Sequence, residues 1–274
     1  MNNRSSLGSK LISAPYIVWS VLFIIAPLIF VVYYSFTDAN GSFTLENMAE
    51  LSKYAPTFLR SIWFGIVATV ICLIIAFPLA YIISQKTEKV QRTLVMLVML
   101  PMWMSFLIRT YSWMALLQDT GIINNFLTKI GLSSMHMINT PGAVILGMVY
   151  NFLPFMIMPI YSVMAKLDHS MVEACQDLGG NRLTVIRKCI IPMSMPGVVS
   201  GITMVFVPSV STFYISQKLG GGSFDLIGDV IERQFQQSYN YNLGAAISLV
   251  LMVLILVSMA VMNRFTEDEE GMVI

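Results

Sequence analysis

Six long apolar stretches, separated by short polar segments, dominate the hydrophobic pattern of the chain. A helix needs about 20 residues to cross a hydrocarbon core of about 30 Å, and the stretches lie at approximately 14–36, 61–84, 93–117, 141–165, 196–215 and 243–263. Backbone polar groups have no water partner in lipid, so we expect helices rather than the short alternating strands of a membrane barrel. The pattern predicts an all-α integral membrane protein with six transmembrane helices. No internal repeat is visible, and we expect one domain, residues 1–274.

The polar segments between these stretches predict the orientation. The first stretch is longer than the roughly 7–15 apolar residues of a signal peptide, and no small-residue cleavage site follows it, so we expect it to be a retained span. With the N-terminus inside, ten of the 16 Lys and Arg residues lie in inner segments, as the positive-inside rule favours. Both termini and the polar segment 166–195 are therefore predicted to be cytoplasmic.

This inner segment has the pattern of a short, soluble helix–turn–helix, and its centre reads EACQDLGGNRLTVIRKCIIP, from Glu173 to Pro192. Ser170 and Glu173 fit a capping box, in which a hydroxyl and a carboxylate satisfy free amides at the start of a helix. The predicted helix covers Met171–Leu178, and Gly179-Gly180 is suited to the left-handed turn that ends it.

A second helix is predicted after this turn. Asn181 is a suitable N-cap for it, and we expect it to end before Pro192, because proline disfavours the helical conformation of the residue that precedes it. The first helix is only about two turns long, which is too short to be stable alone. We therefore expect it to dock on another protein.

Composition narrows the classes of function. The chain is 56% hydrophobic and 11% charged, whereas soluble domains carry about 25% charged residues, and a net charge of +1 gives no reason to expect a nucleic-acid partner. The three cysteines form no C-x-x-C pair and there are two histidines, so we expect no zinc or redox site and no cofactor. Phosphate-loop, H-E-x-x-H and nucleophile-elbow motifs are absent from the sequence, so we do not expect an enzyme.

The predicted spans contain no Asp or Glu. Proton- and sodium-coupled carriers usually keep ionisable groups within the membrane, so this argues against a secondary transporter, although backbone carbonyls can also coordinate sodium. Arg109 is the one charge within an apolar stretch, and we interpret it as a side chain that snorkels to the outer interface. Gly197 and Gly201 form a small-xxx-small pair that predicts close helix packing. Kinks that suit a pathway of bent helices are predicted at Pro27, Pro78, Pro101, Pro154, Pro159 and Pro208.

The segment at 173–192 resembles the E-A-A-x-x-x-G-x9-I-x-L-P loop of permease subunits of ATP-binding-cassette importers. The matching residues are Glu173, Ala174, Gly179 and Pro192, while Cys175 replaces the second alanine, Cys189 the isoleucine and Ile191 the leucine. The resemblance implies that the short helix is a coupling helix, which sits in a groove of an ATPase subunit with Glu173 facing that subunit. The carboxylate of Glu173 also serves as the local cap in the alternative interpretation.

Three further stretches resemble spermidine/putrescine importer permeases of the PotB type. They read LPMWMSFLIRTYSW at 100–113, NFLPFMIMPIYSVMAKLD at 151–168 and FYISQKLGGG at 213–222. The resemblance implies the type I importer permease fold, a bacterial inner-membrane location, a second PotC-like permease, two PotA-like ATPases and an external PotD-like binding protein. A polyamine substrate is implied by this resemblance alone.

A polycation needs pathway walls that replace part of its hydration without trapping it, and aromatic faces and neutral oxygens near helix kinks meet that need. Candidates are Trp103, Tyr150, Asn151, Phe155, Ser209, Thr212, Phe213 and Tyr214, each of which has helix packing or an interfacial aromatic belt as its alternative role. Asp225, Asp229 and Glu232 are spaced to form one acidic face of an outer helix, which either receives a cation or its binding protein or is simply solvated.

The sequence thus predicts a permease subunit that moves a polyamine inward by alternating access and draws its energy from partner ATPases. Three alternatives stay open. The first is a permease of the same kind for another small solute, such as an amino acid, a sugar or an oxyanion. The second is a sodium-coupled carrier, which would transport alone. The third is a membrane-embedded enzyme, for which the sequence offers no polar catalytic cluster.

Overall fold

The computed structural model describes residues 15–167, 170, 175–177, 179 and 181–270. The described part is helical almost throughout, with one isolated β-bridge between Thr37 and Phe43. The chain divides into two compact units, the first made of residues 1–55 and 230–254 and the second of residues 56–229 and 255–274. Each unit is described by itself below. The assignment of the whole chain to one domain stays a prediction.

The first unit begins with the first predicted span, a helix at Pro15–Ser35. It contains a π turn, η1 (Val21–Ile25), followed by α2 (Ala26–Ser35). The π turn comes directly before Pro27, because the wider turn absorbs the missing amide of the proline. The predicted kink therefore takes the form of a π turn within one continuous span.

Two asparagine side chains organise the polar end of this unit. The Asn47 amide, on the short helix α3 (Glu46–Glu50), donates to the carbonyls of Ser35 (3.3 Å) and Thr37 (2.9 Å). The Asn242 amide, at the start of α14 (Tyr241–Glu270), donates to the Thr37 carbonyl at 2.7 Å. These bonds satisfy carbonyls that the end of α2 leaves without helical partners.

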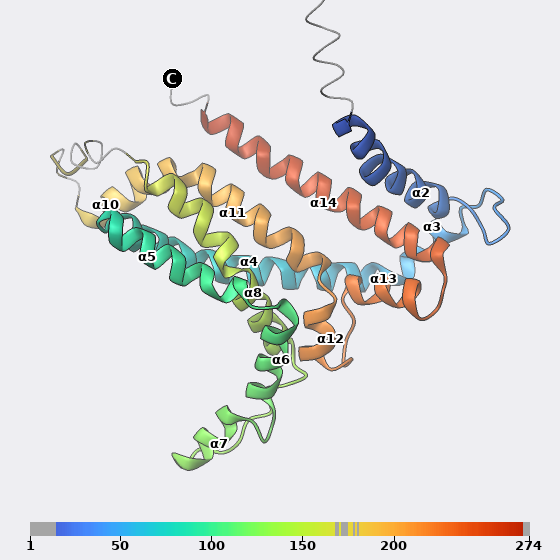
Figure 1. The fold of residues 1–274 in the computed structure, drawn as a ribbon, viewed down its shortest axis with the longest axis horizontal. Coiled ribbons are helices and arrows are strands. Elements are labelled where there is room, and N and C mark those ends of the chain that lie inside the picture. Colours follow the sequence, from blue (N-terminus) through green and yellow to red (C-terminus); the bar gives the residue numbers. More distant parts are fainter. Residues whose placement is uncertain (1–14, 168–169, 171–174, 178, 180, 271–274) are drawn as a thin grey trace, which may run out of the picture. The chain divides into compact units, whose positions relative to one another are not determined.

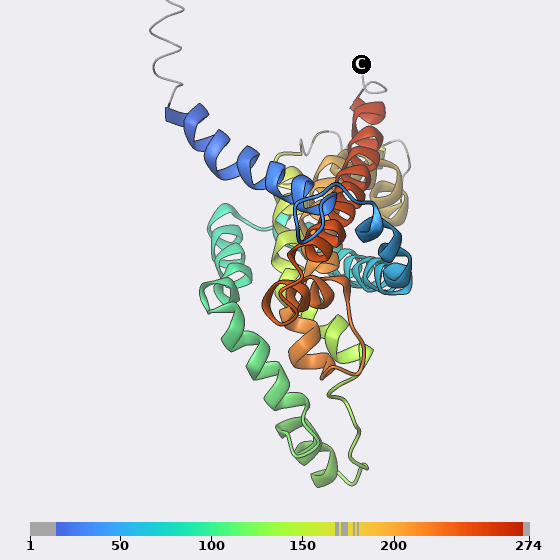
Figure 2. The ribbon, with the colours of Figure 1, turned by 90° about the vertical axis from the view of Figure 1, so that its right-hand side faces the viewer.

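The second unit contains most of the remaining helices. In chain order they are α4 (Ala55–Ser84), α5 (Glu88–Met99), η3 (Leu100–Trp103), α6 (Phe106–Leu117), α7 (Ile122–Lys129), α8 (Pro141–Met164), α10 (Arg182–Val185), η4 (Ile186–Ile190), α11 (Ile191–Ser211), α12 (Tyr214–Gly220) and the start of α13 (Ile227–Gln236). The short helix η2 (Leu51–Tyr54) belongs to the first unit. In both views α7 lies beyond the far end of α6 (Figures 1 and 2).

The third predicted span differs from expectation. Within the described residues, five helices are long and apolar enough to cross a membrane. The predicted span at 93–117, in which a kink is expected at Pro101, is a pair of helical segments, Glu88–Trp103 and Phe106–Lys129, bent by 86° (Figure 1). Pro101 lies in the short 3₁₀ turn η3, which starts at Leu100, and the backbone then turns away from the helical conformation at Met104 (ψ 147°) and Ser105 (ψ 134°). The kink expected at Pro101 is thus a break in the helix just after it, and hydropathy does not show this break because apolar composition continues across it.

The fifth span also differs in its bounds. The predicted stretch 196–215 is a helix at Ile186–Ser211, which passes through Pro192 and ends where Thr212 turns extended. The π turn η4 lies just before Pro192, as η1 lies before Pro27, and its wider turn accommodates the missing amide of the proline. The expectation that the second helix of the polar segment stops before Pro192 was therefore wrong.

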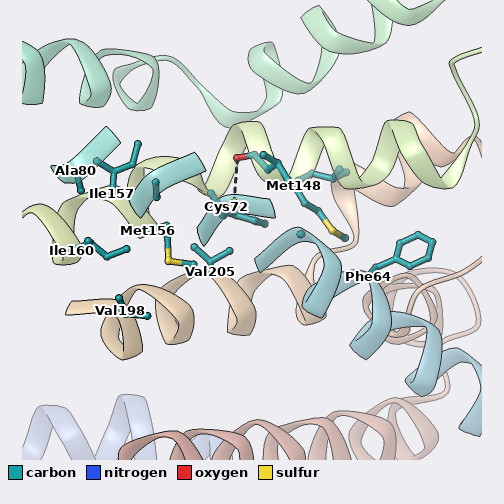
Figure 3. Packing of buried hydrophobic residues seen from close by; sticks show 14 of the residues in the cluster. Phe64, Cys72, Ala80, Met148, Met156, Ile157, Ile160, Val198 and Val205 are labelled. Carbon is teal, nitrogen blue, oxygen red and sulfur yellow. Dashed lines mark hydrogen bonds between the residues drawn. The ribbon is translucent and has the colours of Figure 1, made fainter. Parts of the chain in front are cut away.

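The core of the second unit lies between α4, α8 and α11. Figure 3 shows Met156 and Ile160 of α8 against Val198 and Val205 of α11, with Cys72 of α4 donating its thiol to the Val149 carbonyl. The small-xxx-small prediction is confirmed, because a Cβ atom on Gly197 would lie 2.8 Å from the Pro159 carbonyl oxygen and one on Gly201 would lie 2.8 Å from the Met156 sulfur. Glycine thus allows the two backbones to approach closely.

Candidate functional site

A cavity of about 510 Å³ lies between α5, η3, α8 and α11, in the range of volumes that proteins use for small ligands. Its wall includes the two prolines inside α8 and the glycine at which α11 approaches them. The lining residues are Met99, Met102, Pro154, Phe155, Met158, Pro159, Ser162, Val163, Gly197, Ser200 and Met204. Two of the prolines at which kinks were predicted, Pro154 and Pro159, thus line this cavity, and its role in a pathway stays a prediction.

The chemistry of this wall is apolar, soft and uncharged. Four methionines supply flexible, polarisable thioethers, Phe155 supplies an aromatic ring, and Ser162 and Ser200 supply hydroxyls. None of the lining residues is ionisable in the physiological range. Such a wall can accommodate an alkyl chain and offers hydroxyl oxygens to a cation, but it has no fixed charge that would hold a cation strongly.

Only one of the eight sequence-predicted pathway residues lines the cavity, and that residue is Phe155. The ring centroids of Tyr150 and Trp113 lie 5.3 Å apart, and the Trp103 side chain, in η3, is 74% exposed. Thr212 and Phe213 form the junction between α11 and α12. Their pathway roles stay predictions.

Two of the predicted polar candidates are buried, and each donates a hydrogen bond to a backbone carbonyl of its own helix. The Ser209 hydroxyl donates to the Val205 carbonyl at 2.7 Å, and the Asn151 amide donates to the Gly147 carbonyl at 2.9 Å. The Asn151 side-chain oxygen is buried and has no hydrogen-bond partner in the described part of the chain. Asn151 therefore retains an unused acceptor, whereas the hydrogen of Ser209 is already engaged.

Tyr214 belongs to a separate cluster formed by α6 and α12. Its ring lies 5.8 Å from the ring of Phe106 and 6.2 Å from that of Tyr111. The Lys218 ammonium lies 5.8 Å from the Tyr214 ring centroid and 5.6 Å from that of Tyr111. The Tyr214 ring, which was expected to meet a cationic solute, thus lies beside a lysine of the same chain.

Arg109 lies in the first turns of α6 and is 7% exposed. Its Nε and Nη1 atoms are buried without a hydrogen-bond partner among the described residues, and its guanidinium lies 5.9 Å from the Phe106 ring centroid. The interpretation of a snorkelling side chain is wrong, because it assumed a continuous third span whose end reaches the interface. The bend after η3 instead places Arg109 inside the protein.

The described parts of the polar segment follow the predicted turn. Cys175–Asp177 are helical, and Gly179 has φ 82°, the left-handed conformation expected at the helix end. Asn181 caps α10, because its side-chain oxygen accepts from the Thr184 amide and hydroxyl, both at 2.8 Å. Glu173 and Ala174 lie outside the described residues, so the capping box and their contacts stay predictions.

After this turn the chain leads directly into the core. Val185, Cys189 and Ile190 are buried and belong to the same hydrophobic cluster as α8 and α11. Because η4 continues into α11 without a break, the turn at Gly179 is followed by a helix that lines the cavity. Pro192, the last matching motif residue, lies in the first turn of α11.

The predicted acidic face is not a single exposed row. Helix α13 starts at Ile227, so Asp225 precedes it, and Asp229 is 6% exposed. The Asp229 carboxylate accepts from the Ser216 hydroxyl at 2.9 Å and from the Leu226 amide at 2.8 Å. The expectation was wrong for Asp229, because its carboxylate is buried and accepts the hydrogen bond of the Leu226 amide at the start of the helix. Whether Asp225 and Glu232 meet a cation or a binding protein stays a prediction.

Sequence reasoning missed most of the cavity wall. The methionines at 99, 102, 158 and 204 were not considered, because an apolar residue in an apolar span gives no signal that separates a pathway wall from a packed core. The available signal was the cluster of kinks, since Pro154 and Pro159 are five residues apart in one helix and both line the cavity.

Comparison with protein families and curated proteins gives a consistent similarity. Residues 76–267 match the family model described as "Binding-protein-dependent transport system inner membrane component". The chain is 37% identical over 248 residues to the spermidine/putrescine transport system permease protein PotB of Haemophilus influenzae, covering 86% of each chain. It is 36% identical over 245 residues to the protein of the same name from Escherichia coli, covering 86% of this chain and 89% of that one.

Solved structures with a similar fold include a bacterial ABC transporter involved in the import of the acidic polysaccharide alginate. The TM-score is 0.78 at 19% identity, with 97% of this chain and 96% of that chain covered. A second structure, the alginate transporter in complex with an alginate pentasaccharide-bound periplasmic protein, gives a TM-score of 0.74 at 18% identity, with 96% and 94% covered. At these identities the similarity concerns the fold.

Proposed function

Because the chain belongs to the family of binding-protein-dependent transport system inner membrane components, we propose that it is the transmembrane permease subunit of an ATP-driven importer of polyamines. The observation that carries the substrate class is the identity of 35–37% to PotB proteins over 86–92% of this chain. The chain is a multi-pass inner-membrane protein and a transport subunit. Its function is to provide part of the route that a polyamine takes across the membrane.

The cavity between α8 and α11 suits such a solute. A polyamine alternates ammonium groups with short methylene chains, so its methylenes can contact methionine and proline while its ammonium groups meet hydroxyls, water and the Phe155 ring. A cation–π contact is worth about 0.5–2 kcal/mol. A wall with only such weak contacts lets a cation enter and leave, which transport requires.

Energy comes from partner subunits in this proposal. Two ATPase subunits bind on the cytoplasmic side, a second permease completes the pathway and an external binding protein delivers the polyamine. The short helix before Gly179 docks on an ATPase, with Glu173 and Ala174 at the contact. Since Gly179 leads through α10 and η4 into α11, movement of that helix reaches the cavity wall through one connected segment.

The test is uptake by the assembled complex. The chain is co-purified with its ATPases, second permease and binding protein, placed in vesicles, and given labelled spermidine, putrescine or an amino acid. We expect uptake and stimulated ATP hydrolysis with a polyamine, and loss of both stimulation and uptake in Glu173→Ala. Stimulation by the amino acid instead would favour the alternative of an importer for another solute, and sodium-driven uptake by this chain alone would favour a carrier.

A matched pair of variants tests the cavity. Phe155→Ala changes the wall, while Phe126→Ala changes an exposed ring on α7 that does not line it. We expect weaker polyamine uptake at limiting concentration for Phe155→Ala and wild-type uptake for Phe126→Ala. Equal behaviour of the two variants would contradict a role of this cavity in transport.

A further inference from the structure

A lysine ammonium lies beside two tyrosine rings where α6 and α12 meet. Tyr111 lies on α6, whereas Tyr214 and Lys218 are four residues apart on α12 and therefore share one face of that helix. The ammonium nitrogen lies 5.6 Å from the Tyr111 ring centroid and 5.8 Å from that of Tyr214. The two ring centroids are 6.2 Å apart, and the rings are nearly perpendicular, at 85°. Tyr111 and Tyr214 thus form an aromatic cage whose occupant is a cation of the same chain.

The contacts that hold this ammonium are weak. Both ring distances lie near the outer limit of about 6 Å for a cation–π contact. Among the described residues, no salt bridge involves Lys218. The lysine stem is flexible, so the ammonium can leave the rings without a movement of the backbone. The long distances also leave room for a cation larger than a lysine ammonium.

The cage lies on the two segments that lead away from the cavity. Helix α6 follows η3, which lines the cavity at Met102, and α12 follows α11, which lines it at Met204 (Figure 1). Tyr111 is 45% exposed, whereas Tyr214 is half-buried and its ring lies 5.8 Å from that of Phe106. The cage is therefore open on the Tyr111 side, and a cation that arrives there meets the rings that Lys218 contacts.

We propose that Tyr111 and Tyr214 form a binding site for one ammonium group of an alkyl amine, and that Lys218 is a tethered occupant which the solute displaces. A lysine side chain ends in methylenes and a primary ammonium, as a polyamine does, so the rings accept either cation by the same contacts. The tether holds Lys218 near the cage at a high effective concentration. A dilute monovalent cation therefore competes poorly for the site.

The selectivity of the cage rests on the proposed function. A polyamine carries several ammonium groups on one chain, so when one replaces Lys218 the others are held close to the route, an advantage that a monoamine lacks. The Arg109 guanidinium, 5.9 Å from the Phe106 ring, adds a second fixed positive charge to this part of the unit. Repulsion from both fixed charges keeps the bound ammonium weakly held, and weak binding allows it to leave again.

Displacement of Lys218 is measured first without transport. The complex of this chain with its second permease and ATPases is pulsed with an acetylating reagent, and acetylation of each lysine is quantified by mass spectrometry. The probe is the bis(trimethylammonium) analogue of putrescine, because it has no reactive amine and aromatic cages bind quaternary ammonium groups. We expect the probe to raise acetylation of Lys218 about three- to tenfold and to leave Lys129, an exposed lysine on α7, unchanged.

A variant of the cage keeps this measurement decisive. In Tyr214→Leu one ring is lost, so acetylation of Lys218 should be high from the start and insensitive to the probe. Acetylation of Lys218 that does not respond to the probe in wild type would overturn the proposal. The same conclusion would follow if wild type and Tyr214→Leu behaved alike.

Binding is then compared in matched variants. Equilibrium binding of labelled spermidine to the same complex is measured for wild type, Lys218→Met and Lys129→Met, since methionine keeps an unbranched stem and removes the charge. We expect about three- to tenfold tighter binding in Lys218→Met and no change in Lys129→Met. Addition of Tyr214→Leu to Lys218→Met should abolish the gain, whereas addition of Tyr214→Phe should preserve it.

The outcomes separate the cage from the proposed function. An equal gain in both lysine variants would assign the effect to net charge and overturn the proposal, as would no gain in Lys218→Met. Spermidine is an alkyl amine whatever the chain imports, so both measurements test the cage directly. If the polyamine assignment fails, spermidine does not stimulate ATP hydrolysis by the complete wild-type complex, while the probe still exposes Lys218 to acetylation.

Discussion

In the α8–α11 pair, Gly197 lies within a regular helix and has no space beside it, since an added Cβ would lie 2.8 Å from the Pro159 carbonyl oxygen. In the segment before α10, Gly179 has φ 82° and no atom of the described chain within 4 Å of the position of an added Cβ. The first glycine is required by space and the second by backbone conformation. The same substitution at both positions therefore tests two different properties, the packing of the membrane core and the backbone conformation of the polar segment before α10.

The largest effect is expected from Gly197→Val. The new side chain meets backbone atoms of Pro159 and Ile160, which cannot rotate away, so the destabilisation should reach or exceed the upper end of the roughly 1–3 kcal/mol typical of overpacked cores. The measurement is the unfolding temperature of the purified complex. Gly142→Ala is the control, because an added Cβ there meets only the Thr140 hydroxyl at 3.8 Å. An unchanged unfolding temperature in Gly197→Val would contradict the close approach of α8 and α11.

A smaller effect is expected at Asp229, whose buried carboxylate accepts two hydrogen bonds at the start of α13. Asp229→Asn weakens the bonds from the Ser216 hydroxyl and the Leu226 amide, and hydrogen bonds to charged groups contribute about 1.5–3 kcal/mol. Ser216→Ala removes one of these bonds and should cost less. Because Asp229 is buried, the loss of stability should be insensitive to salt, unlike an effect on capture of a cation at the surface. A loss of polyamine uptake that disappears at high salt, with stability unchanged, would support the original interpretation of an exposed acidic face.

The sequence predicted the features that depend on near neighbours. Hydropathy located five spans, and the G-x-x-x-G spacing predicted the close approach of another helix, which the structure identifies as α8. The residues around Gly179 and Asn181 predicted a left-handed turn followed by a cap. Each of these signals operates within a few residues or along one helix face. Local patterns are therefore sufficient where local bonding decides the structure.

Features that depend on distant contacts or on a break in bonding were not predictable. The bend after η3 lies within a continuous apolar run, so hydropathy does not detect it, and Arg109 was placed at the interface as a result. The prediction of an acidic row assumed that Asp225 already belongs to the helix. Helix α13 instead starts at Ile227, and the Asp229 carboxylate accepts a hydrogen bond from the Leu226 amide.

The smallest effect on stability, and the most selective effect on function, is expected from Gly179→Val. A left-handed backbone costs an ordinary residue roughly 1–2 kcal/mol, and a β-branched residue resists it more than asparagine does. Gly179 has open space around it, so the substitution should change the turn rather than the core, and the unfolding temperature of the complex should shift less than in Gly197→Val. Substrate-stimulated ATP hydrolysis should fall, because the short helix before the turn no longer has its proper orientation. Gly179→Asn is the matched control, since asparagine tolerates positive φ, and it should retain most of the stimulation. If Val and Asn behave alike, backbone conformation is not what this position contributes, and the contrast with Gly197 fails.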